Sequence, residues 1–367
     1  MLTLLAVAGL ISMVLGAGIY TQKPAFGSSP SGTRLQKIED SPNYANGEFQ
    51  NLIPTAKFSE GTTSVAALWE YQVKEKIRLH PAEPLPSKKV DLTQLRRQED
   101  IVVWLGHSSV YLQLGGKRFL VDPVFSSYAS PASFINKAFE GSNPYGAEDM
   151  PAIDYLLISH DHWDHLDYPT IMSLKPKIKN IICPLGVGGY FEEWGFSPDS
   201  IHEADWFTPL QMEPDLTVHV LPSRHFSGRT LVQNKTQWAG FAVLTPQRRV
   251  FISGDGGYGP HFKMIGEHFK HFDLAIMENG QYNPRWPYIH MMPEEVALAT
   301  EELHAKALLP VHAGKFALSS HAWDEPFQRI AAASEKKPYK LFTPLLGEPV
   351  ALDDNQQAFS HWWENAD

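Results

Sequence analysis

The sequence is poor in cysteine and in basic charge. A single cysteine, Cys183, stands among 367 residues, so the chain can form no internal disulfide and offers no cluster of thiolates for structural zinc. Lys and Arg number 31 against 41 Asp and Glu, which gives a formal net charge of −10. Because a phosphate backbone needs clustered basic residues, this balance argues against a nucleic-acid ligand. No arrangement of Ser or Cys183 with a base indicates a nucleophilic triad.

Charge is also missing from the first 20 residues. About twenty consecutive apolar residues are enough to cross a bilayer as a helix. No Lys or Arg precedes this run, although such residues are usual at the start of a secretory signal. We therefore expect residues 1–20 to be a hydrophobic signal-anchor that associates the protein with a membrane. A cleaved signal is the alternative, and the side of the membrane stays open.

Composition divides the rest of the chain into three parts. Residues 21–94 form an extension, in which Pro, Gly, Ser and Asn without periodicity predict a linker or an extended wrap up to residue 54. Apolar side chains at helical spacing then predict an amphipathic helix at residues 63–79, packed on the main domain or facing lipid or substrate. Short apolar runs alternate with helical patterns over residues 95–350, which predicts an α/β domain. Residues 351–367 are expected to be a C-terminal tail.

One stretch holds a dense set of potential metal ligands. Residues 153–159 are a short apolar run, as expected of a buried strand, and the order His-x-His-x-Asp-His follows at residues 160–165. Imidazole nitrogen and carboxylate oxygen are the ligands of zinc sites that stay reactive. His160 and His162 would point the same way in an extended turn, whereas Asp164 and His165 would face a neighbouring point. This one segment could therefore serve two metal ions.

Three further apolar runs end in a His or an Asp. They lead to His225, to Asp255 within a Ser-Gly-Asp-Gly turn, and to His312. Because the loops at strand ends of an α/β protein collect along one edge of the sheet, these side chains are expected to complete the ligand set. A single His at a strand end is more often a structural hydrogen-bonding group. The expectation therefore depends on all three residues occurring at equivalent strand ends.

The order of these motifs resembles that of the metallo-β-lactamase superfamily. Further blocks are similar to the family of N-acylphosphatidylethanolamine-hydrolysing phospholipase D, and the similarity covers residues 95–345. These blocks are residues 122–131, 165–168, 254–258, 282–286, 293–295 and 312–318. Asp161 and Trp163 depart from the Asn and Tyr of the animal enzymes, and the N-terminal extension lies outside the similarity.

The resemblance implies a fold and a set of roles. The fold would be a four-layer αββα sandwich of two mixed sheets flanked by helices, with the N-terminal membrane-anchor extension added. The first metal would be held by His160, His162 and His225, and the second by Asp164, His165 and His312, with Asp255 between them. Asp164 and Asp255 would be the catalytic carboxylates. Asp122 would orient a ligand imidazole or cap a turn, and further pocket candidates are His107, Arg285 and His321.

The implied activity is hydrolysis by two zinc ions, although iron or manganese would accept the same ligands. A metal-bridging hydroxide would attack the phosphorus of N-acyl phosphatidylethanolamine-like phospholipids, as in a phosphodiesterase of phospholipase D type, at the inner membrane of a bacterial cell. A lactonase or carboxylic-ester hydrolase would use the same site on another small anionic or ester substrate. A non-catalytic membrane-tethered metal-binding scaffold is the alternative of another class, disfavoured because seven ligands for two metals leave room for water. The oligomeric state stays open.

Overall fold

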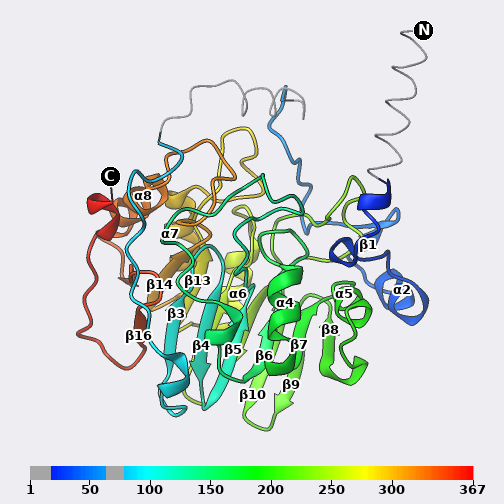
Figure 1. The fold of residues 1–367 in the computed structure, drawn as a ribbon, viewed down its shortest axis with the longest axis horizontal. Coiled ribbons are helices and arrows are strands. Elements are labelled where there is room, and N and C mark those ends of the chain that lie inside the picture. The colour runs from blue at the N-terminus through cyan, green and yellow to red at the C-terminus, as the bar shows by residue number, and fades with distance from the viewer. Residues whose placement is uncertain (1–17, 63–77, 367) are drawn as a thin grey trace.

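Two facing seven-stranded sheets form the centre of the molecule (Figure 1). The computed structural model describes residues 18–62 and 78–366. The first sheet consists of β16 (Pro349–Ala351), β3 (Ile101–Trp104), β4 (Val110–Leu114), β5 (Lys117–Val121), β6 (Ile153–Leu157), β7 (Ile178–Pro184) and β8 (Ile201–Ala204), in that order. The second consists of β15 (Lys340–Leu341), β14 (Ala307–Val311), β13 (Leu274–Glu278), β12 (Arg249–Ile252), β11 (Gly240–Leu244), β10 (Leu216–Leu221) and β9 (Thr208–Glu213). Each sheet is antiparallel on one side and parallel on the other, so the expected pair of mixed sheets is confirmed.

The central strands of each sheet are buried on both faces, which explains why their sequences are mostly apolar. In β3, Val102 and Trp104 belong to the core between the sheets, whereas Ile101 and Val103 belong to a second core on the outer face. Side chains of a strand alternate between its two faces, so a strand covered on both faces needs an apolar residue at every position. All four positions of β3 are buried.

Helices cover the outer face of each sheet. Residues of α4 (Tyr168–Leu174) and α5 (Gly188–Glu193) pack in the core outside the first sheet. Residues of α6 (His261–Phe269), α7 (Pro293–Glu302) and α8 (Glu325–Ser334) pack in the core outside the second. The layers are therefore helix, sheet, sheet and helix (Figure 1).

One local feature stabilises the start of α7, and another allows α6 to pack closely against α7. Pro293 occupies the first turn of α7, and the carboxylate of Glu295 accepts a hydrogen bond from the Met292 amide at 2.9 Å, which stabilises the helix start. Gly266 of α6 lies so close to α7 that an added Cβ would stand 1.8 Å from the carbonyl oxygen of Glu302. Only glycine allows this approach of the two helices.

The strand ends that carry the proposed ligands share one edge of the sandwich. The hairpin turns of β4–β5 and β9–β10 lie along the lower edge in Figure 1, so β5 and β10 run toward the upper edge. Strand β6 is parallel to β5, and β12 and β14 run in the same direction as β10, because two antiparallel pairings separate β10 from β12 and parallel pairings join β12 to β14. The loops after β6, β10, β12 and β14 therefore begin at that same edge.

The N-terminal extension wraps the domain where it is described. It contains α2 (Gly32–Glu39), β1 (Tyr44–Ala45) and β2 (Glu48–Phe49), and the side chains of Ile38 and Phe49 enter the core between the sheets. Arg34 forms ion pairs with Glu203 at 2.7 Å and Glu192 at 2.8 Å. This part of the extension therefore packs against the domain and contains a helix and a short hairpin.

The two membrane-related expectations fall largely outside the described part. Residues 1–17 of the expected anchor and residues 63–77 of the expected amphipathic helix lie outside the described residues. Among residues 18–62 and 78–366, no helix combines the length and the hydropathy needed to cross a membrane. The structure therefore gives no support to the anchor.

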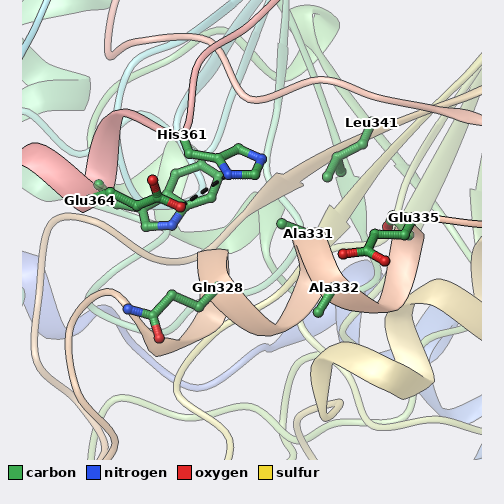
Figure 2. Close-up of a pocket in the computed structure, with 9 residues that line it drawn as sticks. Gln328, Ala331, Ala332, Glu335, Leu341, His361 and Glu364 are labelled. Atoms are coloured by element: carbon green, nitrogen blue, oxygen red, sulfur yellow. Dashed lines mark hydrogen bonds and ion pairs between the residues drawn. The ribbon is translucent and has the colours of Figure 1, made fainter.

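The C-terminal segment packs on the domain. In a final helical turn at Trp362–Asn365, the side chains of Trp362 and Trp363 are buried in the core between the sheets. Beside them, His361 and Glu364 face α8 across a shallow hollow (Figure 2). The described part of the C-terminal segment, residues 351–366, therefore contributes to the core.

Candidate metal centre

Three imidazoles from two different loops converge at the upper edge of the sandwich. His160 and His162 follow β6, and His225 follows β10. His162 Nδ1 lies 2.8 Å from His160 Nε2 and 3.3 Å from His225 Nε2. The Nδ1–H of His225 is occupied by the carbonyl oxygen of Ile289 at 2.9 Å, which leaves the Nε2 lone pair directed at the other rings. Three ring nitrogens that face one another in this way fit a cation.

A second group lies beside the first. His165 Nε2 is 3.5 Å from Asp164 Oδ2, and His107 Nε2 is 2.8 Å from the same oxygen. His312, at the end of β14, completes the group, and its Nδ1 lies 2.9 Å from Ser108 Oγ. The potential ligand atoms of these residues all lie within 4.8 Å of one another. These two groups contain six of the seven residues that the sequence assigned to two metal ions, and Asp255 is the seventh.

Asp255 stands between the two groups. One carboxylate oxygen, Oδ2, lies 3.0 Å from His165 Nε2 and 3.8 Å from His225 Nε2. The other, Oδ1, lies 3.1 Å from His312 Nδ1 and has no hydrogen-bond partner although it is buried. An orphaned buried oxygen is costly, and a cation would satisfy it. The donor set therefore fits a pair of divalent ions that share this carboxylate.

The loop that carries the first ligands is fixed by two buried carboxylates. Asp122, directly after β5, accepts hydrogen bonds from Ser159 N at 2.8 Å, Ser159 Oγ at 2.6 Å and His165 Nδ1 at 2.9 Å. It thereby orients a ligand imidazole. Asp161 points the other way and accepts hydrogen bonds from Tyr190 Oη, Gly228 N and Thr236 Oγ1, at 2.7 to 2.9 Å. It therefore anchors the loop without reaching either group of ligands.

Backbone strain marks the same region. His107, Asp122 and His312 have φ values of 51°, 40° and 65°, a conformation that side chains other than glycine rarely adopt. The His312 amide donates to the carbonyl oxygen of His107 at 2.9 Å, which ties the two strained residues together. Such strain persists only where the surroundings over-determine it, and it concentrates at functional sites.

Burial sets the protonation of these groups. It lowers the pKa of His160, His225 and His312 well below the usual range of an imidazole and lowers that of His162 to about 4. These rings are therefore neutral near pH 7, which is the form that binds metal. Burial also raises the pKa of Asp255 to about 6.

A carboxylate–imidazole pair in the second group behaves differently. Burial opposes charge on His165 and Asp164 alike, but their attraction overcomes it. The negative charges of Asp255 and Asp164 raise the pKa of His165 well above its usual value. The positive charge of His165 holds the pKa of Asp164 well below its usual value. A proton held in this way occupies the place that a cation would take, so metal binding is expected to release it.

Two sequence candidates, His321 and Arg285, make backbone contacts in the structure. Both ring nitrogens of His321 bond to backbone, with Nε2 accepting from Gln281 N at 2.9 Å and Nδ1 donating to the carbonyl oxygen of Ala322 at 2.8 Å. Arg285 is half-buried, and its carbonyl oxygen accepts from Ser59 N at 2.7 Å. His107, the third such candidate, lies inside the second group.

The sequence reasoning missed His290 and Glu278. The ring of His290 stacks on His312 with centroids 5.1 Å apart, and its Nδ1 lies 3.0 Å from Glu278 Oε2. His290 also offers a ring nitrogen within 4.8 Å of ligand atoms of His225 and Asp255. Glu278 is the last residue of β13, so a search of every strand end would have found it. His290 lies inside a long loop, where spacing gives no signal.

Comparison with known proteins agrees with this geometry. A family model described as a beta-lactamase superfamily domain matches residues 117–313. An uncharacterized protein of Mycobacterium tuberculosis (strain ATCC 25618 / H37Rv) is 36% identical over 97% of each chain. The N-acyl-phosphatidylethanolamine-hydrolyzing phospholipase D 1 of Caenorhabditis elegans is 33% identical over 67% of this chain and 74% of its own length.

The fold has relatives among solved structures. Igni18, a metallo hydrolase of Ignicoccus hospitalis, superposes with a TM-score of 0.52 at 21% identity, over 68% of this chain and 97% of that chain. The chain belongs to the metallo-β-lactamase superfamily of metal-dependent hydrolases, and an N-acylphosphatidylethanolamine-hydrolysing phospholipase D is among its homologues.

Proposed function

We propose that this chain is a dinuclear zinc-dependent phosphodiesterase of phospholipase D type that acts on N-acyl phosphatidylethanolamine-like phospholipids. The observation that carries the proposal is the position of Asp255, whose two oxygens face two adjoining groups of buried imidazoles. The similarity to a phospholipase D of this kind, over two thirds of the chain, supports the substrate class.

Each part of the site would have a separate task. His160, His162 and His225 would hold one ion. Asp164, His165 and His312 would hold the other, with Asp255 in contact with both. Two such ions would supply a water of lowered pKa and would polarise the oxygens of a phosphodiester.

The chain's own residues would set the charge of the site and act on the bound substrate. Asp164 and Asp255 offset only part of the charge of two divalent ions while the five imidazoles remain neutral, so the site would stay cationic and favour an anionic phosphodiester. His290 lies against both groups without being needed to complete either, and Glu278 fixes its ring. In this proposal, His290 would exchange a proton with the bound substrate.

The test is hydrolysis by the purified, zinc-loaded full chain. Vesicles that contain N-acyl phosphatidylethanolamine should release phosphatidic acid and N-acylethanolamine, measured by mass spectrometry. Asp255→Asn should abolish the release. His261→Gln is the matched control, because His261 is a buried histidine outside both groups, and this variant should keep the activity.

Two outcomes would replace the proposal. Hydrolysis of lactones or carboxylic esters, without release of phosphatidic acid, would assign the site to that chemistry. A metal analysis that finds iron or manganese in the active protein would reassign the ions.

The membrane anchor at residues 1–20 stays a prediction, and extraction of the native protein from washed membranes by detergent but not by salt would support it.

A further inference from the structure

Exposed apolar side chains gather on three segments that adjoin the candidate metal centre. We call Ile19, Tyr20, Phe134, Ile135, Leu231 and Val232 the apolar patch. Phe134 keeps 83% of its surface exposed, and Leu231 is fully exposed. Scattered apolar residues on a surface need no explanation, but a group on neighbouring loops marks an interaction site.

Contacts show that the three segments are neighbours. The Tyr20 hydroxyl donates to the carbonyl oxygen of Pro131 at 2.6 Å, which joins the first segment to the loop that carries Phe134. Thr21 and Val232 line one hollow of about 210 Å³, which joins the first segment to the third. Segments from three distant parts of the sequence therefore form one surface.

This surface is attached to the ligand loop. The ring of Phe26 lies 4.9 Å from the ring of Trp163, which stands between His162 and Asp164 in the sequence. The guanidinium of Arg229 lies 3.7 Å from the centre of the same ring. Residues 18–26, in dark blue at the upper right of Figure 1, lie on the edge that carries the ligand loops.

The three segments that carry the apolar patch contain charged residues of one sign only. Residues 18–30, 126–139 and 226–237 contain no Asp or Glu, although the chain has 41 acidic residues and a net charge of −10. Among the charged residues in these segments, Lys23 and Lys137 are exposed and Lys235 is half-buried, whereas Arg229 is buried against Trp163. Exposed apolar side chains with basic neighbours are typical of a protein surface that lies in the interface of an anionic bilayer.

We propose that the apolar patch inserts into the interface of a bilayer that contains anionic phospholipids and so places the metal centre against the lipid headgroups. The sequence adds a second reason, because the uncharged residues 1–17 join the described chain directly beside Ile19 and Tyr20. A second copy of the chain is a poorer occupant. A symmetric dimer would set the lysines of these segments against one another, and like charges repel. This inference deepens the proposed function, but its test does not require turnover.

Site-specific probes test the surface in the full chain. The only cysteine, Cys183, is completely buried, so Leu231→Cys and Phe134→Cys can each be labelled at one place with an environment-sensitive fluorophore. Leu298→Cys on α7 is the matched control, because Leu298 is an exposed apolar residue on a helix outside the second sheet. Vesicles of phosphatidylethanolamine with phosphatidylglycerol, with brominated acyl chains as quencher, are compared with vesicles of phosphatidylcholine alone.

The emission of probes at positions 134 and 231 should shift to the blue and be quenched by brominated lipid, whereas the probe at position 298 should not respond. The response should be stronger with phosphatidylglycerol than with phosphatidylcholine alone. Silent probes at both positions would overturn the proposal, and equal responses in the two vesicles would overturn its anionic part. A shift that depends on protein concentration without vesicles would assign the apolar patch to a second copy.

A turnover measurement separates this inference from the proposed function. The double substitution Phe134→Ser and Leu231→Ser should lower hydrolysis of vesicle substrate roughly tenfold or more, because two apolar side chains lose their burial in lipid. Hydrolysis of a short-chain, monomeric phosphodiester should be unchanged. Equal loss on both substrates would contradict the inference. If no phospholipid is hydrolysed at all, the proposed function fails while the probes still decide where the bilayer binds.

Discussion

The role of Asp122 can be tested against a neighbouring carboxylate of nearly the same environment. Asp122 and Asp161 are both buried, and each accepts three hydrogen bonds within the ligand loop or onto it. Only Asp122 bonds to a ring that would hold metal, through His165 Nδ1 at 2.9 Å. Substitutions at Asp122 and at Asp161 therefore distinguish a residue that orients a metal ligand from a residue that only holds the loop in place.

The substitution Asp122→Asn keeps the shape and removes one acceptor. The amide can accept from the Ser159 backbone or from His165, but its NH₂ group faces the remaining donors. Loss of one hydrogen bond to a charged group costs about 1.5–3 kcal/mol, which corresponds to roughly tenfold to hundredfold in zinc affinity. Asp161→Asn should cost similar stability and leave zinc affinity nearly unchanged.

Both quantities can be measured on the same samples. Zinc affinity comes from competition with a chelating dye, and stability comes from calorimetric melting of the chelated protein. Equal losses of zinc affinity in the two variants would refute the reasoning, as would an unchanged affinity in Asp122→Asn. Reduced melting temperature in both, with reduced affinity in Asp122→Asn alone, is the expected result.

Four further predictions concern the site and the fold. Chelation should lower the free energy of unfolding by about 4 kcal/mol relative to protein at a thousandfold excess of zinc over its dissociation constant, measured by calorimetry. In chelated protein, burial lowers the pKa of His162 to about 4, so the unfolded chain binds a proton first as the pH falls below 6.5. Stability should therefore fall from pH 6.5 toward pH 4, by about 3 kcal/mol from this residue, and denaturant titrations check it. His290→Ala should lower turnover about hundredfold while zinc content stays at the wild-type level. Gly266→Ala should destabilise the protein by about 1–3 kcal/mol or more, because its Cβ would meet the carbonyl oxygen of Glu302, and zinc affinity should not change.

The sequence predicted the part of the site that depends on strand ends. His225, Asp255 and His312 each follow a recognisable apolar run. The ends of β12 and β14 reach one edge through parallel pairing, and β10 runs in the same direction because two antiparallel pairings separate it from β12. His290 escaped because its position depends on how a long loop folds back on the second sheet. The ring nitrogens of His321 are held by backbone groups that only the folded chain reveals.

The packing of the two ends of the chain was harder to predict. Polar composition indicated a linker or a wrap up to residue 54, but it could not show that Ile38 and Phe49 enter the core. The last residues have no periodic pattern, yet Trp362 and Trp363 fill space between the sheets. Large aromatic side chains in short segments are buried by tertiary contacts, which spacing along the sequence does not encode.

The division of the ligands between the two sheets has a mechanical consequence. One sheet supplies the loop with His160, His162, Asp164 and His165, and the other supplies His225, Asp255 and His312. Bound ions would therefore act as a cross-link across the open edge of the sandwich, and the halves could separate there only by giving up the ions. Release of metal and exposure of the inner strands to solvent become a single event, so amide exchange deep in the molecule should slow as free zinc rises.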